Sequence, residues 1–196
     1  MREIAEIILK KIQTIQMERE RVLVAIDGRC GSGKTTLAAL LQDELSCELI
    51  HMDDFYLRPE QRTAQRLAEP GGNVDYERFL AEVLQPLRAG QPFCYRPFDC
   101  SVWDFKEAIA VTPGAVTLVD GSYSCTPKLY TCYDLRIFLT LDQEEQSRRI
   151  LLRGGAEKAA QFRERWIPLE ELYFSSVPVA ERCELYFDTT DAGFPL

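Results

Sequence analysis

Two groups of residues have the types and spacing that phosphoryl chemistry requires. The first is GRCGSGKT, residues 28–35, which matches the pattern G-x-x-x-x-G-K-[S/T]. Its glycines let the backbone curl so that successive N–H groups point at one anion. Lys34 supplies a charge to the β- and γ-phosphates, and Thr35 supplies a hydroxyl to Mg²⁺. The residues expected to bind ATP are Gly28, Gly31, Ser32, Gly33, Lys34, Thr35 and Thr36.

The second group is a pair of adjacent carboxylates, Asp53 and Asp54, in the stretch ELIHMDDFYLRPE. Transfer of a phosphoryl group to an alcohol needs an acceptor for the hydroxyl proton. His51 is the single histidine of the chain, so a histidine base elsewhere is excluded. The two aspartates stand just beyond a predicted strand, where ligands bind in open α/β sheets. Either carboxylate can serve as the base on this reasoning, and a turn is the alternative role for the pair.

Other classes of phosphate-loop protein fit the sequence less well. The stretch VTLVD ends at Asp120, which suits the acidic residue of a Walker B strand. Motor ATPases usually follow this residue with a glutamate that activates water, whereas here GSYS follows. The guanine-reading motif N-K-x-D is also excluded, because Asn73 is the single asparagine. These observations favour a kinase that acts on a small molecule.

An arginine-rich segment with two glycines predicts a lid over the nucleotide. Gly154 and Gly155 interrupt a helical pattern there, and a glycine hinge suits a segment that closes and excludes water. Arg153 stands just before the hinge and is the best candidate for a phosphate contact. A solvated charged helix face is the alternative role for any one of the arginines, which are Arg148, Arg149, Arg153, Arg163 and Arg165.

Hydrophobic patterning places these residues on an alternating series of strands and helices. Short apolar runs predict strands at 21–27, 47–52, 115–120, 135–141 and 183–188. Helical spacing and capping predict helices at 2–19, 35–46, 75–90, 142–153 and 168–182. Such alternation predicts a doubly wound, mainly parallel sheet with helices on both faces, which is the α/β fold of P-loop proteins. A hairpin excursion is expected at about 90–112 and the lid at about 153–165.

Length and composition limit the classes of function further. The 196 residues fit a single domain, and the net charge of −8 argues against a nucleic-acid partner. Seven cysteines without a C-x-x-C pair suit reduced thiols in a cytoplasmic protein. No stretch is apolar for long enough to span a membrane. The isoleucine stripe of residues 2–19 leaves open whether this helix packs on its own domain or on a second subunit of a homo-oligomer.

Taken together, GRCGSGKTTLA, IHMDDFYLRP, VDGSYS and RRILLR resemble the uridine kinase-like family of P-loop kinases. The family includes uridine–cytidine kinase, nicotinamide riboside kinase, pantothenate kinase and phosphoribulokinase. The resemblance implies that Asp53 receives the proton of the ribose 5′-hydroxyl and lies near Mg²⁺, and that Asp120 also lies near Mg²⁺. It implies ribose contacts from Asp75 in GGNVDYERF, and nucleobase contacts from Tyr95, with Arg96 and Phe98 beside it, in QPFCYRPFDC.

Two segments depart from the uridine kinase pattern. No histidine follows Tyr95, and the lid reads RGGAEKAAQFRERW where uridine kinases carry R-D and then E-R-G-R. The expected activity is ATP- and Mg²⁺-dependent phosphorylation of a primary hydroxyl, first of uridine or cytidine. The first alternative is phosphorylation of nicotinamide riboside or pantothenate. The second alternative is that the protein is a non-catalytic regulator that binds ATP.

Overall fold

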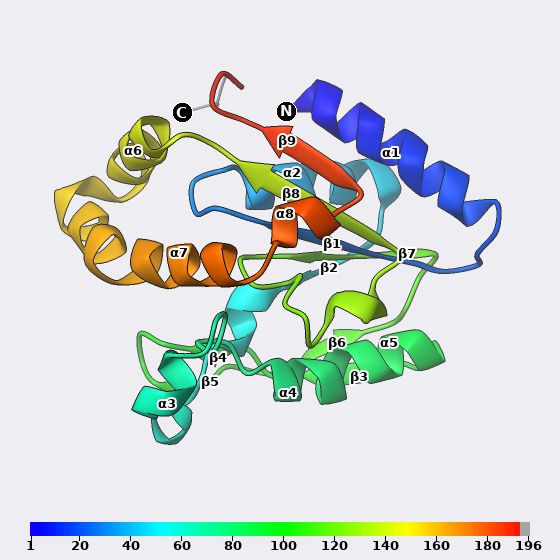
Figure 1. The fold of residues 1–196 in the computed structure, drawn as a ribbon. Helices are drawn as coiled ribbons and strands as arrows, with labels where there is room; N and C mark the ends of the chain where they lie inside the picture. Colours follow the sequence, from blue (N-terminus) through cyan, green and yellow to red (C-terminus); the bar gives the residue numbers. More distant parts are fainter. Residues whose placement is uncertain (193–196) are drawn as a thin grey trace.

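A five-stranded parallel sheet lies at the centre of the computed structural model, which describes residues 1–192 (Figure 1). The strands follow the order β2-β7-β1-β8-β9. Their bounds are Val22–Gly28 for β1, Glu48–His51 for β2, Val116–Asp120 for β7, Leu135–Thr140 for β8 and Leu185–Asp188 for β9. Because the chain extends the sheet to both sides of β1, the sheet is doubly wound, and the predicted α/β fold is confirmed.

Strand β1 shows why the sheet is covered on both faces. Val24 and Ile26 belong to one buried cluster, and Leu23 and Ala25, which alternate with them, belong to another. Since successive side chains of a strand point to opposite faces, an uninterrupted apolar run requires a layer of helices on each side. The two hydrophobic clusters are these two layers.

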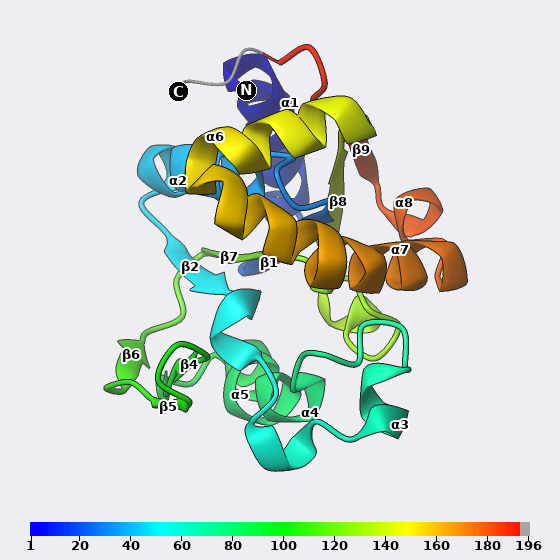
Figure 2. The same cartoon turned by 90° about the vertical axis from the view of Figure 1, so that its left-hand side faces the viewer.

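Helices form both layers, as two views at right angles show (Figures 1 and 2). Helices α1 and α2 cover one face, while α4, α5 and α7 lie over the other. The α-helices are α1 Arg2–Gln16, α2 Lys34–Leu45, α3 Ala64–Leu67, α4 Tyr76–Phe79, α5 Gln85–Ala89, α6 Gln143–Gln161, α7 Ile167–Ser176 and α8 Val179–Arg182. In the part of the chain that the structure describes, no helix has the length and apolar character needed to cross a bilayer.

Helix α1 packs on its own domain. Ile8 and Ile12 are fully buried in the same cluster as Leu37 of α2 and Val24 of β1. The helix ends at Gln16, three residues before the predicted end. Ile8 and Ile12 are therefore covered within the subunit, whereas Ile7 of the same helix is 48% exposed.

The predicted helix at 75–90 and the predicted excursion after it are both present. A π-helical turn, Leu80–Leu84, joins α4 to α5, and Gly90 ends this helix in a left-handed conformation. Two small antiparallel hairpins follow, one nested in the other. The outer pairs β3, Phe93–Tyr95, with β6, Ile109–Val111, and the inner pairs β4, Phe98–Asp99, with β5, Asp104–Phe105.

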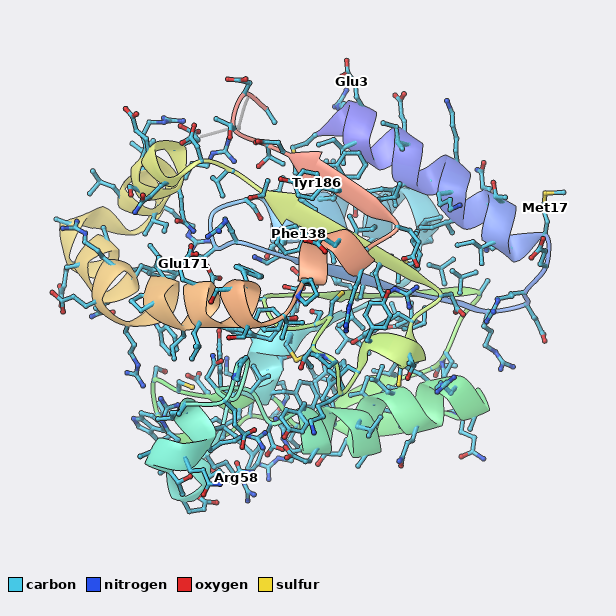
Figure 3. The ribbon with its side chains drawn as sticks, viewed as in Figure 1. Glu3, Met17, Arg58, Phe138, Glu171 and Tyr186 are labelled. Atoms are coloured by element: carbon cyan, nitrogen blue, oxygen red, sulfur yellow. The ribbon has the colours of Figure 1, made fainter. Side chains whose placement is uncertain are left out.

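The C-terminal part of the sheet also follows the predicted pattern. The Asp142 side chain caps α6 by accepting from the Glu145 N–H at 2.7 Å, and Gly155, at φ 73°, interrupts the helix. A π-helical turn, Phe162–Trp166, leads into α7. On the last strand, the Tyr186 ring stacks on Phe138 of β8 with 6.0 Å between centroids (Figure 3).

Candidate active site

A cavity of about 910 Å³ lies at the carboxyl ends of β1, β2 and β7. The phosphate loop and the ends of these strands line one side, and α6, the following π-turn and α7 line the other. The lining residues are Cys30, Gly31, Gly33, Lys34, Thr35, Thr36, His51, Asp53, Tyr56, Asp120, Gly121, Ser122, Tyr123, Arg148, Arg149, Leu152, Arg153, Lys158, Phe162, Trp166 and Glu170. Of the residues predicted to bind ATP, Gly28 and Ser32 lie beneath this surface.

The phosphate loop has a backbone that only glycine supports. Gly28 adopts φ +142°, and a β-carbon there would lie 2.0 Å from the Leu139 carbonyl oxygen of the neighbouring strand. Gly33 adopts φ 92° immediately before α2 begins at Lys34. This places the positive end of the α2 dipole at the cavity.

The loop residues fit a bound phosphate. The Lys34 ammonium is almost fully buried and donates to the carbonyl oxygens of Gly28 at 2.8 Å and Arg29 at 2.9 Å. The buried hydroxyl of Ser32 has no hydrogen-bond partner among the described residues. Unpartnered buried polar atoms are rare, and this hydroxyl lies beneath the cavity rather than in its lining. The curled glycine backbone and the Lys34 ammonium are the features of the loop that suit the nucleotide phosphates predicted from the motif.

Three oxygen-bearing residues predicted for Mg²⁺ line the same cavity: Thr35, Asp53 and Asp120. Asp120 is buried at the end of β7, directly opposite His51 in the β2–β7 register. His51 Nδ1 contacts Asp120 Oδ1, and this hydrogen bond raises the pKa of the histidine. Within residues 1–192, no group of three His, Cys, Asp or Glu side chains is arranged so that it could hold a metal ion by itself. This donor set fits Mg²⁺, which commonly takes one or two carboxylates and completes its shell with phosphate oxygens and water.

The structure separates the two adjacent aspartates. They lie on a 3₁₀ turn, Met52–Phe55, in which Met52 and Phe55 share the buried face. Asp53 lines the cavity and accepts a hydrogen bond from the Tyr56 hydroxyl at 3.0 Å. Asp54 accepts instead from the Tyr95 hydroxyl at 3.1 Å, and burial raises the pKa of its carboxyl. The predicted strand at 47–52 therefore ends one residue early, at His51, because Met52 begins this turn.

The four residues predicted to contact the acceptor do not line this cavity. Asp75 is buried and caps α4 by accepting from the Arg78 N–H at 3.0 Å. Tyr95 is buried against Phe55, and Phe98, on strand β4 of the inner hairpin, is buried against Phe105. Arg96 is exposed and donates to the Phe105 and Lys106 carbonyl oxygens. The aromatic side chains at the cavity are Tyr56, Tyr123, Phe162 and Trp166.

The arginine-rich segment at 148–165, which includes the predicted lid at about 153–165, places only some of its arginines at the cavity. Three of its predicted arginines line the cavity, Arg148, Arg149 and Arg153, whereas Arg163 and Arg165 do not. Arg149 is buried and donates to the Thr189 carbonyl oxygen at 2.6 Å. The Arg153 guanidinium lies 5.7 Å from the centre of the Phe162 ring, which follows the kink at Gly155.

A buried carboxylate that the sequence analysis missed supports the phosphate loop. Asp27 is fully buried and accepts from the N–H groups of Gly28 at 2.7 Å, Tyr123 at 3.0 Å and Cys125 at 2.9 Å, and from the Tyr173 hydroxyl at 3.0 Å. These contacts join the loop to the segment after β7 and to α7. The available signal was a charged residue inside the otherwise apolar run VLVAID.

The burial of Asp27 predicts a pH dependence of stability. Desolvation by burial raises its pKa to about 6 from the ordinary 3.8. Between these values the folded state binds more protons, so the residue's contribution to the free energy of unfolding falls as the pH rises. We expect Asp27→Asn to remove this fall. In thermal unfolding from about pH 4 to about pH 7, the midpoint of the variant should therefore rise relative to the native protein.

Asp43→Asn, which removes an exposed carboxylate of α2, is the matched control. Its midpoint should stay parallel to that of the native protein across the same range. If the midpoints of Asp27→Asn and the native protein differ by the same amount at every pH, Asp27 is already ionised in the folded state throughout this range.

Glu170 is a second residue that sequence reasoning missed. Both of its carboxylate oxygens lie 3.0 Å from the Cys30 backbone nitrogen, and Oε1 accepts from the Ser122 hydroxyl at 2.7 Å. The next residue, Glu171, forms an ion pair with Arg29. These contacts connect helix α7 to the phosphate loop. Glu170 and Cys30 are 140 positions apart, and no motif spacing in the sequence indicates such a contact.

Comparison with known proteins agrees with this arrangement. No family model matches the chain. A uridine kinase of Lactiplantibacillus plantarum is 24% identical over 156 residues, which cover 74% of this chain and 73% of that protein. The chain is similar to the uridine kinase-like P-loop kinases. The predicted resemblance is therefore confirmed, and the relatives support the prediction of a phosphotransferase.

Several solved structures share this fold, and their names give them different phosphoryl acceptors. A possible uridine kinase from Bacillus stearothermophilus has a TM-score of 0.68 at 20% identity, over 95% of this chain and 100% of that one. A candidate fructose transport system kinase from Silicibacter sp. TM1040 has a TM-score of 0.69 at 22% identity, over 91% and 97%. A D-glycerate 3-kinase from Cryptococcus neoformans has a TM-score of 0.61 at 17% identity, over 87% of each chain. The fold thus leaves the acceptor open.

Proposed function

We propose that the protein is an ATP-dependent kinase that transfers the γ-phosphoryl group to a primary hydroxyl, with the 5′-hydroxyl of uridine or cytidine as the first acceptor. The observation that carries this proposal is the shared cavity. The phosphate-loop Lys34, the carboxylate of Asp53 and the buried Asp120 all line one space of about 910 Å³. A protein that only binds a nucleotide has no need for a carboxylate such as Asp53 beside the phosphates.

The residues at the cavity have different roles in the proposed phosphoryl transfer. The loop N–H groups and Lys34 bind the nucleotide phosphates, and Thr35, Asp53 and Asp120 hold Mg²⁺, which neutralises charge on the phosphates when bound. Asp53 accepts the proton of the attacking hydroxyl. Arg153, on the lid side of the cavity, balances charge on the transferred group.

The aromatic lining of the cavity supports an acceptor with a flat ring. Tyr56 and Trp166 pack on each other with 5.8 Å between ring centroids and 34° between ring planes, and the Tyr56 hydroxyl donates to Asp53. Aromatic faces of this kind suit a nucleobase or a nicotinamide ring. Nicotinamide riboside is therefore the second acceptor in the proposal. The roles predicted for Asp75, Tyr95, Arg96 and Phe98 stay predictions, since these side chains lie outside the cavity.

The test is ADP release from Mg-ATP with a panel of uridine, cytidine, nicotinamide riboside and pantothenate. We expect acceptor-dependent turnover with uridine or cytidine, and none with their 5′-deoxy analogues, which lack the reacting hydroxyl. Release with nicotinamide riboside alone would move the assignment to that acceptor. ATP binding without acceptor-dependent release for any of the four would instead support a nucleotide-binding regulator.

A further inference from the structure

A second cavity, of about 430 Å³, lies at the amino ends of the sheet strands, opposite the first cavity. Residues from the amino ends of three strands line it: Val22, the first residue of β1, and Thr117 and Arg136, the second residues of β7 and β8. The candidate active site lies at the carboxyl ends of the sheet, beside α6, and the second cavity lies at the amino ends, beside α5. Figure 1 shows α6 and α5 on opposite sides of the molecule.

The lining of the second cavity is strongly positive. Its charged residues are Arg19, Arg21, Arg88, Arg136 and Asp134. Four positive charges thus meet one negative charge, in a protein whose net charge is −8. Like charges gathered around a concave surface repel one another and raise the local potential for an anion.

Asp134, the one carboxylate among the described residues that line the second cavity, already accepts hydrogen bonds from the protein. Asp134 Oδ1 accepts from the Arg19 guanidinium at 2.6 Å, and Oδ2 accepts from the Leu23 backbone N–H at 2.8 Å. Arg136 is likewise satisfied, because it forms an ion pair with Glu184 and donates to the Tyr130 carbonyl oxygen at 3.0 Å. Two of the four arginines are therefore balanced within the protein.

Arg21 and Arg88 are not balanced in this way. Within residues 1–192, neither lies within 4.0 Å of a carboxylate oxygen. The Arg21 guanidinium rests on Gly90, where a β-carbon would lie 2.2 Å from Nη1. Arg88, in the last turn of α5, has one weak contact, 3.9 Å from Nη1 to the Cys132 sulfur. Two separate elements thus bring guanidinium groups with unused donors to one cavity.

We propose that this cavity binds the phosphate group of a small molecule, either free phosphate or a phosphate ester. Guanidinium groups present paired N–H donors that match the oxygens of phosphate, and several of them suit a doubly charged anion. The volume falls within the range of about 300–1,000 Å³ that small-molecule sites occupy, which leaves room for an ester beyond the phosphate. This site is separate from the proposed kinase site and does not depend on that assignment.

Calorimetric titration tests the proposal with inorganic phosphate, pyrophosphate and uridine 5′-monophosphate as probes. The titrations use a Lys34→Ala background, which weakens phosphate binding at the loop. Arg21→Gln/Arg88→Gln is compared with Arg2→Gln/Lys10→Gln, which removes two exposed charges from α1. We expect saturable binding in the control and a dissociation constant at least about tenfold higher in the Arg21/Arg88 variant, as loss of charge-assisted hydrogen bonds predicts.

Backbone amide NMR shifts locate the binding independently. Phosphate addition should move the amides of Gly114 and Thr117, which line the cavity, in the control and not in the Arg21/Arg88 variant. Tighter binding of the nucleotide than of phosphate identifies an ester as the ligand, and equal binding identifies free phosphate. Equal affinity in the two variants, or no saturable binding below about 10 mM, overturns the proposal. If the double variant unfolds early, Arg88→Gln alone, at an exposed helix position, replaces it.

Discussion

Replacement of Asp53 by asparagine is expected to lower kcat by about 10²–10⁴-fold while ATP still binds. The carboxylate lies at the cavity and accepts a hydrogen bond from Tyr56. Asparagine keeps the shape and this hydrogen bond, but it cannot accept the proton of the attacking hydroxyl and it is a weaker ligand for Mg²⁺. Steady-state ADP release and an equilibrium titration with ATP separate the two effects.

Asp54→Asn is the matched control, since it makes the same chemical change at the neighbouring residue. Asp54 does not line the cavity, and its carboxylate accepts from the buried Tyr95. We expect turnover close to that of the native protein and a loss of stability of about 1 kcal/mol from the weakened hydrogen bond. Asp53 is not the base if Asp53→Asn keeps near-normal turnover. The same conclusion follows if Asp54→Asn loses more turnover than Asp53→Asn does.

Lys34→Met is expected to lower kcat/KM by about 10³-fold or more. The ammonium group is almost fully buried in the phosphate loop, where it supplies a fixed positive charge to the nucleotide phosphates. Methionine keeps most of the apolar stem and removes the charge. Affinity for ATP should fall more than affinity for adenosine, because the phosphates alone meet this residue.

The substitution also tests the loop itself. The ammonium donates to the Gly28 and Arg29 carbonyl oxygens, so its loss is expected to lower the free energy of unfolding by about 2 kcal/mol. Lys128→Met, at an exposed position outside the cavity, is the control for the loss of one positive charge. Equal ATP affinity in the Lys34 and Lys128 variants would show that the loop does not bind phosphate through this lysine.

Much of the fold follows from local sequence patterns. Strand β1 is a short apolar run, and its alternate residues, such as Val24 and Leu23, supply both buried faces. Helix limits follow from side chains acting on their own backbone, such as the Asp142 cap of α6 and the left-handed Gly90 after α5. These signals involve residues close in the chain, so the sequence contains them directly.

The division of labour between Asp53 and Asp54 needed the tertiary structure. Adjacent residues on a 3₁₀ turn point about 120° apart, and burial of Met52 and Phe55 sets which direction each carboxylate takes. The same reason explains the residues predicted for the acceptor. Asp75 and Tyr95 have suitable side chains, but a helix cap and a buried ring contact direct them away from the cavity.

By itself, then, the sequence determined the phosphate loop, the order of strands and helices, and the class of chemistry, because short motifs and periodicity carry these. The tertiary structure alone decided which carboxylate faces the cavity and which side chains support the loop. Asp27 meets Tyr173 and Glu170 meets Cys30 across about 140 residues of chain. Only packing brings such residues together, since no local pattern records the partner of a side chain so distant in sequence.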